Sequence, residues 1–262
     1  MSTVFRGTRK HILDWTGQGR EAFARSLNEM IQPANAHVGS DDSWIPQGYR
    51  FPNEAKLSQV GDLYLSERIR GVIDNWWLKH KKGTSVPGWD LLATGDFEGK
   101  KGLILVQGAS HANELGVEGR DIRGNASAHS KANHKHIGAA IEMARKALAG
   151  KFSGVEISRD NHYELSTRVA LAWKLAWEGV PVILLYLGFI GDEGVSDLGE
   201  PFRSSEQWYA FMKEHIRGVL PPGLIGKPIK TKGADMTILL AARNVNSISP
   251  SPTVSTSVAF VP

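Results

Sequence analysis

Asp90 and Gln107 are the polar side chains that this sequence brings together most clearly. A predicted β-hairpin has the arms Leu91–Phe97 and Gly102–Gln107, with a glycine between the arms where a tight turn needs a positive φ. Asp90 directly precedes the first arm, and Gln107 is the last residue of the second. With Glu98-Gly99 as the two-residue loop, Asp90 faces Gln107 on the neighbouring strand. A register shift of one residue would move Asp90 to the other face and disperse the pair.

Further polar residues extend this predicted site. Alternation along the second arm places Ala109 and His111 on the same face as Gln107, provided that the strand continues that far. Another carboxylate, Glu54, falls in the first turn of a helix that apolar spacing predicts from Pro52 to His80. An acid at that position can equally serve the helix dipole. A carboxylate, an amide and an imidazole at the end of a strand are suited to proton transfer or cation binding.

The composition excludes several classes of function. The chain has 262 residues, of which 41% are hydrophobic, and this suits one sizeable α/β domain with additions. It contains no cysteine, so disulfides, zinc fingers and thiol nucleophiles are excluded. No run reaches transmembrane length and no signal-peptide core is visible, so we expect a cytoplasmic protein with no membrane partner. The formal net charge of +4 permits DNA as a partner without requiring it.

Hydrophobic periodicity and turn residues predict a succession of helices and strands. The expected helices are Arg20–Ile31, Pro52–His80, Ile137–Ala149, Ser158–Gly179 and Ser204–Arg217, and the expected strands are Leu91–Phe97, Gly102–Gln107, Val182–Phe189 and Met236–Ala242. Continuous apolar runs within two of these strands are typical of strands covered on both faces. We expect an α/β fold with a central mixed sheet flanked by helices on both faces, as one domain over 1–246 followed by a Ser/Pro/Thr-rich tail over 247–262.

Several of these segments resemble the PD-(D/E)XK, or restriction-endonuclease-like, nuclease superfamily. The similar stretches are PNEAKL (Pro52–Leu57), PGWD (Pro87–Asp90), GKKGLILVQGASHANEL (Gly99–Leu115) and SRDNHYELSTRVALAWKLAWEGVPVILLYLGF (Ser158–Phe189). Together they cover much of the chain, and the order helix, hairpin, helix, strand matches the αβββαβ core of that superfamily. The resemblance implies a DNA-hydrolysing fold in which Mg²⁺ binds the scissile phosphate and activates water.

By position, the resemblance assigns roles to four residues. Asp90 matches the metal-binding aspartate, Gln107 the glutamate, Ala109 the lysine, and Glu54 the helical glutamate, so that Asp90, Gln107 and Glu54 would be the metal ligands. Gln107 keeps an oxygen but loses the charge, and Ala109 cannot orient water or stabilise developing charge as lysine does. His111 is the close substitute as base or ligand. We therefore expect weak or absent Mg²⁺-dependent cleavage of DNA.

Two other functions use the same residues. The first is a non-catalytic module that binds nucleic acid or protein on the nuclease scaffold, because fold does not fix function. The second is a serine hydrolase, since the segment around Ser110 partly imitates the strand–turn–helix nucleophile elbow, with Ala112 in place of the last glycine. A histidine metal site is disfavoured, because the spacing of His134 and His136 puts them on different faces of a helix.

Overall fold

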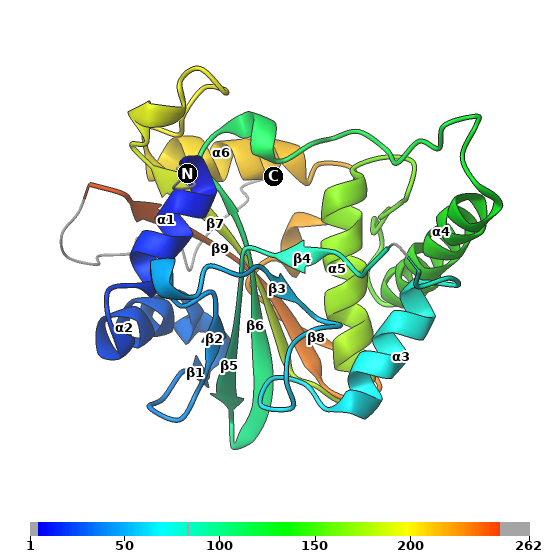
Figure 1. The fold of residues 1–262 in the computed structure, drawn as a ribbon, viewed down its shortest axis with the longest axis horizontal. Helices are drawn as coiled ribbons and strands as arrows, with labels where there is room; N and C mark the ends of the chain where they lie inside the picture. The colour runs from blue at the N-terminus through cyan, green and yellow to red at the C-terminus, as the bar shows by residue number, and fades with distance from the viewer. Residues whose placement is uncertain (1–4, 83, 247–262) are drawn as a thin grey trace.

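The computed structural model describes residues 5–82 and 84–246, and the predicted tail over 247–262 lies outside the described residues. The chain forms an α/β fold in which helices cover both faces of one mixed sheet (Figure 1). This fold class is the one expected from the sequence. No helix in the described ranges is both long and apolar enough to cross a membrane.

Four long strands form the centre of the sheet: β5 (Leu91–Phe97), β6 (Lys100–Ala109), β7 (Val182–Ile190) and β9 (Asp235–Asn244). Neighbours β5 and β6 are antiparallel, whereas β6, β7 and β9 run parallel to one another. The edges are completed by short strands: β1 (Ala36–His37), β2 (Trp44–Ile45) and β8 (Pro228–Lys230). The predicted central strands are confirmed, with ends that differ by up to two residues.

The hairpin register is also confirmed. Leu91 pairs with Val106 and Phe97 with Lys100, so the loop is Glu98-Gly99, as expected. Both loop residues have positive φ, +53° and +86°, as the tight two-residue turn requires. Asp90 directly precedes the first residue of β5, Leu91. Continuing the register by one residue therefore places Asp90 opposite Gln107.

Each face of the sheet has its own apolar core. On one face, Ile104 and Val106 of β6 pack with α1 (Gly7–Thr16) and α2 (Arg20–Ile31). On the other, Leu103 and Leu105 pack with the remaining helices, which are α3 (Glu67–Trp77), α4 (Ala128–Ala149), α5 (Tyr163–Trp177) and α6 (Ser205–His215). Alternate side chains of β6 therefore enter different cores, as expected of a buried strand.

The predicted helix over Pro52–His80 is wrong in its first half. That half holds a two-residue strand, β3 (Ala55–Lys56), which pairs with β4 (Gly88–Trp89), and the helix α3 begins only at Glu67. Backbone N–H groups of Gln59 and Val60 bond to the Lys56 carbonyl, so this segment forms turns. Its buried apolar residues imitate helical spacing while belonging to consecutive turns.

Other differences concern helix ends and one additional helix. The structure contains α1, which the sequence analysis did not predict, and α4 begins nine residues before the expected start, with the Ser127 hydroxyl accepting from the Ser130 amide. Helix α5 starts at Tyr163 instead of Ser158. The backbone amides of His162 and Tyr163 donate hydrogen bonds to the carbonyls of Val117 and Glu118 in a distant loop. Contacts distant in sequence thus decide where this helix begins.

Candidate functional site

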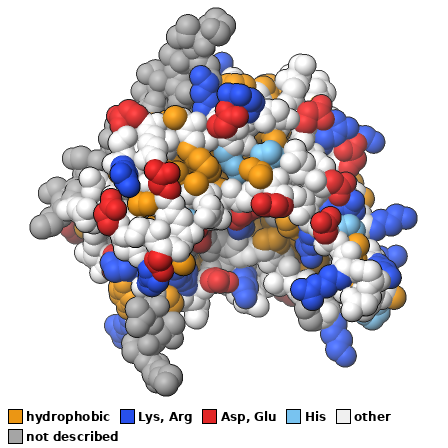
Figure 2. Space-filling view, turned by 90° about the horizontal axis from the view of Figure 1, so that it is seen from above, with side chains coloured by type: hydrophobic (Ala, Val, Ile, Leu, Met, Phe, Trp, Pro, Cys, Tyr) orange, Lys and Arg blue, Asp and Glu red, His pale blue; other side chains and the backbone are white. Residues whose placement is uncertain are grey.

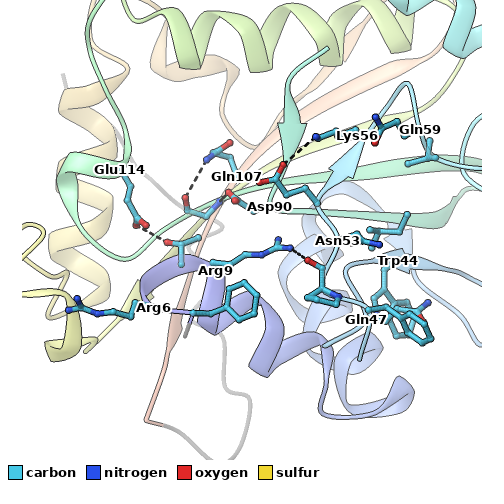
Figure 3. A pocket seen from close by; sticks show the side chains of 18 residues that line it. Arg6, Arg9, Trp44, Gln47, Asn53, Lys56, Gln59, Asp90, Gln107 and Glu114 are labelled. Carbon is cyan, nitrogen blue, oxygen red and sulfur yellow. Dashed lines mark hydrogen bonds and ion pairs between the residues drawn. The ribbon is translucent and has the colours of Figure 1, made fainter. Parts of the chain in front are cut away.

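A polar cavity of about 1010 Å³ opens at the end of the hairpin, where β6 extends beyond β5 (Figure 3). Three segments far apart in sequence surround it: the start of α1, the stretch from β2 through β3 and the residues that follow, and the end of the hairpin. Its charged and amide-bearing wall includes Arg6, Arg9, Glu54, Lys56, Asp90, Gln107 and Glu114. Three of the four predicted site residues, Glu54, Asp90 and Gln107, line this one cavity.

Asp90 sits at the unpaired edge of β6. Its Oδ2 accepts a hydrogen bond of 2.8 Å from the Gly108 amide, a backbone donor that β5 would otherwise occupy. Burial raises the pKa of Asp90 to about 6, although this hydrogen bond and the nearby Arg168 guanidinium oppose the rise. The carboxyl group therefore exchanges a proton near neutral pH, a property suited to chemistry or ligand-linked proton uptake.

Gln107 is held in the sheet with an acceptor unused. The residue is 7% exposed and its Nε2 makes a long contact of 3.5 Å to the Gly108 carbonyl. Its Oε1 is buried and has no hydrogen-bond partner in the described part of the chain. Tyr186, which lies opposite Gln107 on β7, also has a buried hydroxyl without a partner. Because an unsatisfied buried acceptor costs roughly 1–3 kcal/mol, a water or a ligand donor is expected at Gln107.

Glu54 reaches the cavity by a route that differs from the prediction. It precedes β3 in an extended segment instead of starting a helix, so it has no helix dipole to serve. Its side chain is 62% exposed and lies 4.0 Å from the Lys56 Nζ (Figure 3). An exposed carboxylate beside a lysine contributes little on its own to cation binding.

Ala109 and His111 do not contribute to the cavity. Ala109 is fully buried in the core on the α5 face, and His111 is 6% exposed and makes a β-bridge with Pro201. Ala109 keeps the parity of Gln107 within β6 but is enclosed by the core, whereas His111 lies outside the strand because β6 ends at Ala109. The backbone amide of Phe202 donates a hydrogen bond to the Ser110 carbonyl and so stabilises the chain where it leaves β6. His111 Nε2 lies 4.0 Å from Glu114 Oε1, outside hydrogen-bonding distance.

Glu114 is a cavity residue that the sequence analysis did not include among the predicted site residues. Its Oε2 accepts from Thr8 Oγ1 at 2.7 Å, from the Ser110 amide at 2.5 Å and from Ser110 Oγ at 3.0 Å. This carboxylate therefore fastens α1 to the end of β6. Ser110 is fully buried and is followed by a short 3₁₀ helix, Ala112–Glu114, rather than by the long helix of a nucleophile elbow.

Arg168 is a second residue that sequence reasoning missed. It lies on α5 with its guanidinium 4.6 Å from the centre of the Trp89 ring, donates to the Gly88 carbonyl, and approaches Glu164 at 3.5 Å. Its charge lowers the pKa of Asp90, against the larger effect of burial. The spacing of Glu164 and Arg168, four residues apart on a helix, was the available signal, but it is equally typical of a surface pair.

The donor set does not fit a dedicated Mg²⁺ site. Among the described residues, no group of three or more His, Cys, Asp or Glu side chains is placed to hold a metal. The Glu114 carboxylate already accepts three hydrogen bonds, and Glu54 is exposed beside Lys56. The remaining hard oxygens at the end of β6 are the Asp90 carboxyl, whose pKa is about 6, and the Gln107 amide oxygen. A single carboxylate of this kind gives little of the charge that Mg²⁺ requires.

Comparison with family models, curated proteins and solved structures gave no significant match.

Proposed function

We propose that this chain is a nuclease-like protein of the PD-(D/E)XK type that binds nucleic acid in the cavity and cleaves DNA weakly or not at all. The observation that carries the proposal is the end of the hairpin, where the protonatable Asp90 and the neutral Gln107 line the same cavity. The side chain two residues later is Ala109, which is fully buried in the core.

The chemistry follows from these three residues. Hydrolysis of a phosphodiester by a bound metal needs anionic ligands to hold the cation and a positive group near the attacking water. Gln107 offers an amide oxygen without charge, and Ala109 offers no polar group at all. Gln107 lines the cavity in which the phosphate would lie, so its lost charge weakens cation binding there. Position 109 is buried in the core and supplies no cation to the attacking water.

Binding can persist without cleavage, because phosphate contacts depend on lysine and arginine side chains. On the face shown in Figure 2, basic and acidic side chains are interspersed, so this face presents no extended basic surface. The cavity itself carries Arg9 and Lys56 beside the hairpin end. We therefore expect modest, salt-sensitive binding centred on the cavity.

The test of activity compares the native chain with Gln107→Glu and with Gln107→Glu/Ala109→Lys on supercoiled plasmid in Mg²⁺ or Mn²⁺. We expect nicking to be weak or absent for the native chain and to rise by at least tenfold in a repaired chain, and to be lost again when Asp90→Asn is added. Because position 109 is buried, thermal unfolding must first establish that the double variant folds; the single variant retains Ala109 for that reason. Strong metal-dependent cleavage by the native chain that Asp90→Asn abolishes would contradict the proposal.

The test of binding uses fluorescence anisotropy of a labelled DNA duplex at low and moderate salt. Binding that weakens steeply with salt is expected. Absence of binding at low salt would leave a protein-binding module on this fold as the remaining interpretation.

A further inference from the structure

Arg9 is a cavity cation that no carboxylate neutralises in the described part of the chain. It projects from α1, and Figure 3 shows its side chain extending below Asp90 toward the loop at Pro52. One of its terminal nitrogens, Nη2, donates to the Pro52 carbonyl, whereas the other, Nη1, is buried and has no hydrogen-bond partner among the described residues.

The other cations of the cavity are already paired. Arg6 forms an ion pair with Asp197 at 2.5 Å, and Lys56 lies 4.0 Å from Glu54. Arg9 thus differs from both neighbours in holding a donor that lacks an acceptor. A buried guanidinium N–H without an acceptor is unfavourable, so an anionic oxygen entering the cavity would be stabilised there.

The same cavity is also lined by Gln107, which has an acceptor, rather than a donor, without a partner among the described residues. This acceptor is the buried Gln107 Oε1, whereas Asp90 Oδ2 already accepts from the Gly108 amide. Arg9 and Gln107 line the same cavity, so a ligand with an anionic oxygen and a hydroxyl or amino donor would pair with both once the two side chains turn toward it. A nucleotide unit has this combination, with its phosphate as the anion and its sugar or base as the donor.

We propose that Arg9 binds a backbone phosphate of the nucleic acid directly, without a metal ion. This inference rests on the proposed function and assigns its principal phosphate contact to α1, a helix outside the hairpin. The guanidinium supplies the positive charge that position 109 on β6 lacks. Its planar donors match the geometry of phosphate oxygens better than an ammonium group does.

The experiment measures DNA binding by the full chain in EDTA, using a fluorescein-labelled duplex and three variants. Arg9→Gln removes the charge, and Arg9→Lys keeps the charge but removes the planar pair of guanidinium donors. Lys10→Gln is the matched control. Lys10 is the next residue of α1, is paired with Asp14 at 2.6 Å and does not line the cavity. The control therefore makes the same charge change on the same helix without touching the site.

We expect the native chain to bind in EDTA, Arg9→Gln to weaken the Kd about tenfold, and the salt slope of log Kd to fall by about one. Arg9→Lys should lie between the native chain and Arg9→Gln, and Lys10→Gln should stay within about twofold of native. Thermal unfolding of each variant separates loss of contact from loss of folding, and Arg9→Lys provides the second reading should Arg9→Gln fail to fold.

The outcomes separate the two proposals. If the native chain binds DNA and both Arg9 variants bind equally well, the role of Arg9 is overturned while the proposed function stands. Binding that requires Mg²⁺ and vanishes in EDTA also overturns direct, metal-free contact. If the native chain binds no DNA under any of these conditions, the proposed function fails and the inference fails with it.

Discussion

At the scale of single residues, the site depends on three polar groups: Asp90, Gln107 and Arg9. Asp90 binds a proton near neutral pH, Gln107 keeps an unused acceptor, and Arg9 keeps an unused donor. The first two could be located from the sequence, because hairpin register depends on a two-residue turn that Glu98-Gly99 specifies. Arg9 could not, since nothing in the spacing of α1 residues indicates which sheet edge that helix covers.

The raised pKa of Asp90 predicts a particular dependence of stability on pH. Its folded pKa of about 6 lies above the ordinary aspartate value of 3.8, so the folded state binds the proton more tightly than the unfolded chain. Ionisation therefore destabilises the fold as pH rises from about 4 through 6, and the effect is absent below 4. The penalty at pH 7 is roughly 2–3 kcal/mol.

Asp90→Asn should remove this penalty while preserving an acceptor for the Gly108 amide. The free energy of unfolding, measured in urea between pH 4 and pH 7, should change less with pH in the variant than in the native chain. The difference between the two proteins should shift in favour of the variant as pH rises. Parallel pH profiles for the two proteins would contradict this prediction, because they would mean that Asp90 has the same pKa in the folded and the unfolded chain.

At the scale of secondary structure elements, the central strands and the helices α2, α4, α5 and α6 were predictable apart from some of their ends, whereas the segment after Pro52 was not. The strands at 103–106 and 182–187 are continuous apolar runs, which few other structures accommodate. The segment 52–66 has helical apolar spacing, yet its pairing with Gly88–Trp89 outweighs propensity. Glu54 consequently enters the cavity from a strand end, and only the tertiary structure decides this.

The close approach of α1 to β6 gives a prediction about packing at the site. A Cβ at Gly108 would lie 2.6 Å from Thr8 Cγ2 and 3.1 Å from Phe189 Cε2, so α1 would have to shift. Gly108→Ala should destabilise the fold by about 1–3 kcal/mol, measured by urea unfolding.

The matched comparison is Gly71→Ala on α3, where a Cβ meets no atom within 4 Å. That substitution should stabilise the fold by about 0.5–1 kcal/mol, since it replaces glycine inside a helix. Equal effects at both positions would show that α1 does not pack tightly on β6 in solution.

At the scale of the whole molecule, the cavity exists only because three distant segments meet. Residues of α1, the strand β3 and the end of β6 are separated by roughly 45–100 positions of sequence, and no local pattern indicates their contact. The sheet and its two cores followed from hydrophobic patterning, which acts over a few residues at a time. The docking of α1 follows instead from a side-chain cluster around Glu114 that becomes apparent only in three dimensions.

Glu114 should therefore stabilise the packing of α1 against the sheet. Its Oε2 accepts hydrogen bonds from Thr8 of α1 and from the amide and hydroxyl of Ser110 at the end of β6. Glu114→Gln removes the charge that strengthens these bonds and should lower the free energy of unfolding by about 1–2 kcal/mol. Glu118→Gln, an exposed change nearby, is the control and should stay within about 0.5 kcal/mol of native.

Hydrogen exchange locates the effect of Glu114→Gln within the molecule. If Glu114 holds α1 in place, the amides of α1 should exchange faster by a larger factor than those of β7, because the helix would open before the sheet unfolds. Equal acceleration in α1 and β7 would mean that the two layers unfold as one unit. In that case the cavity wall would be held by the apolar contacts of Ile12 and Trp15, with Glu114 contributing only to global stability.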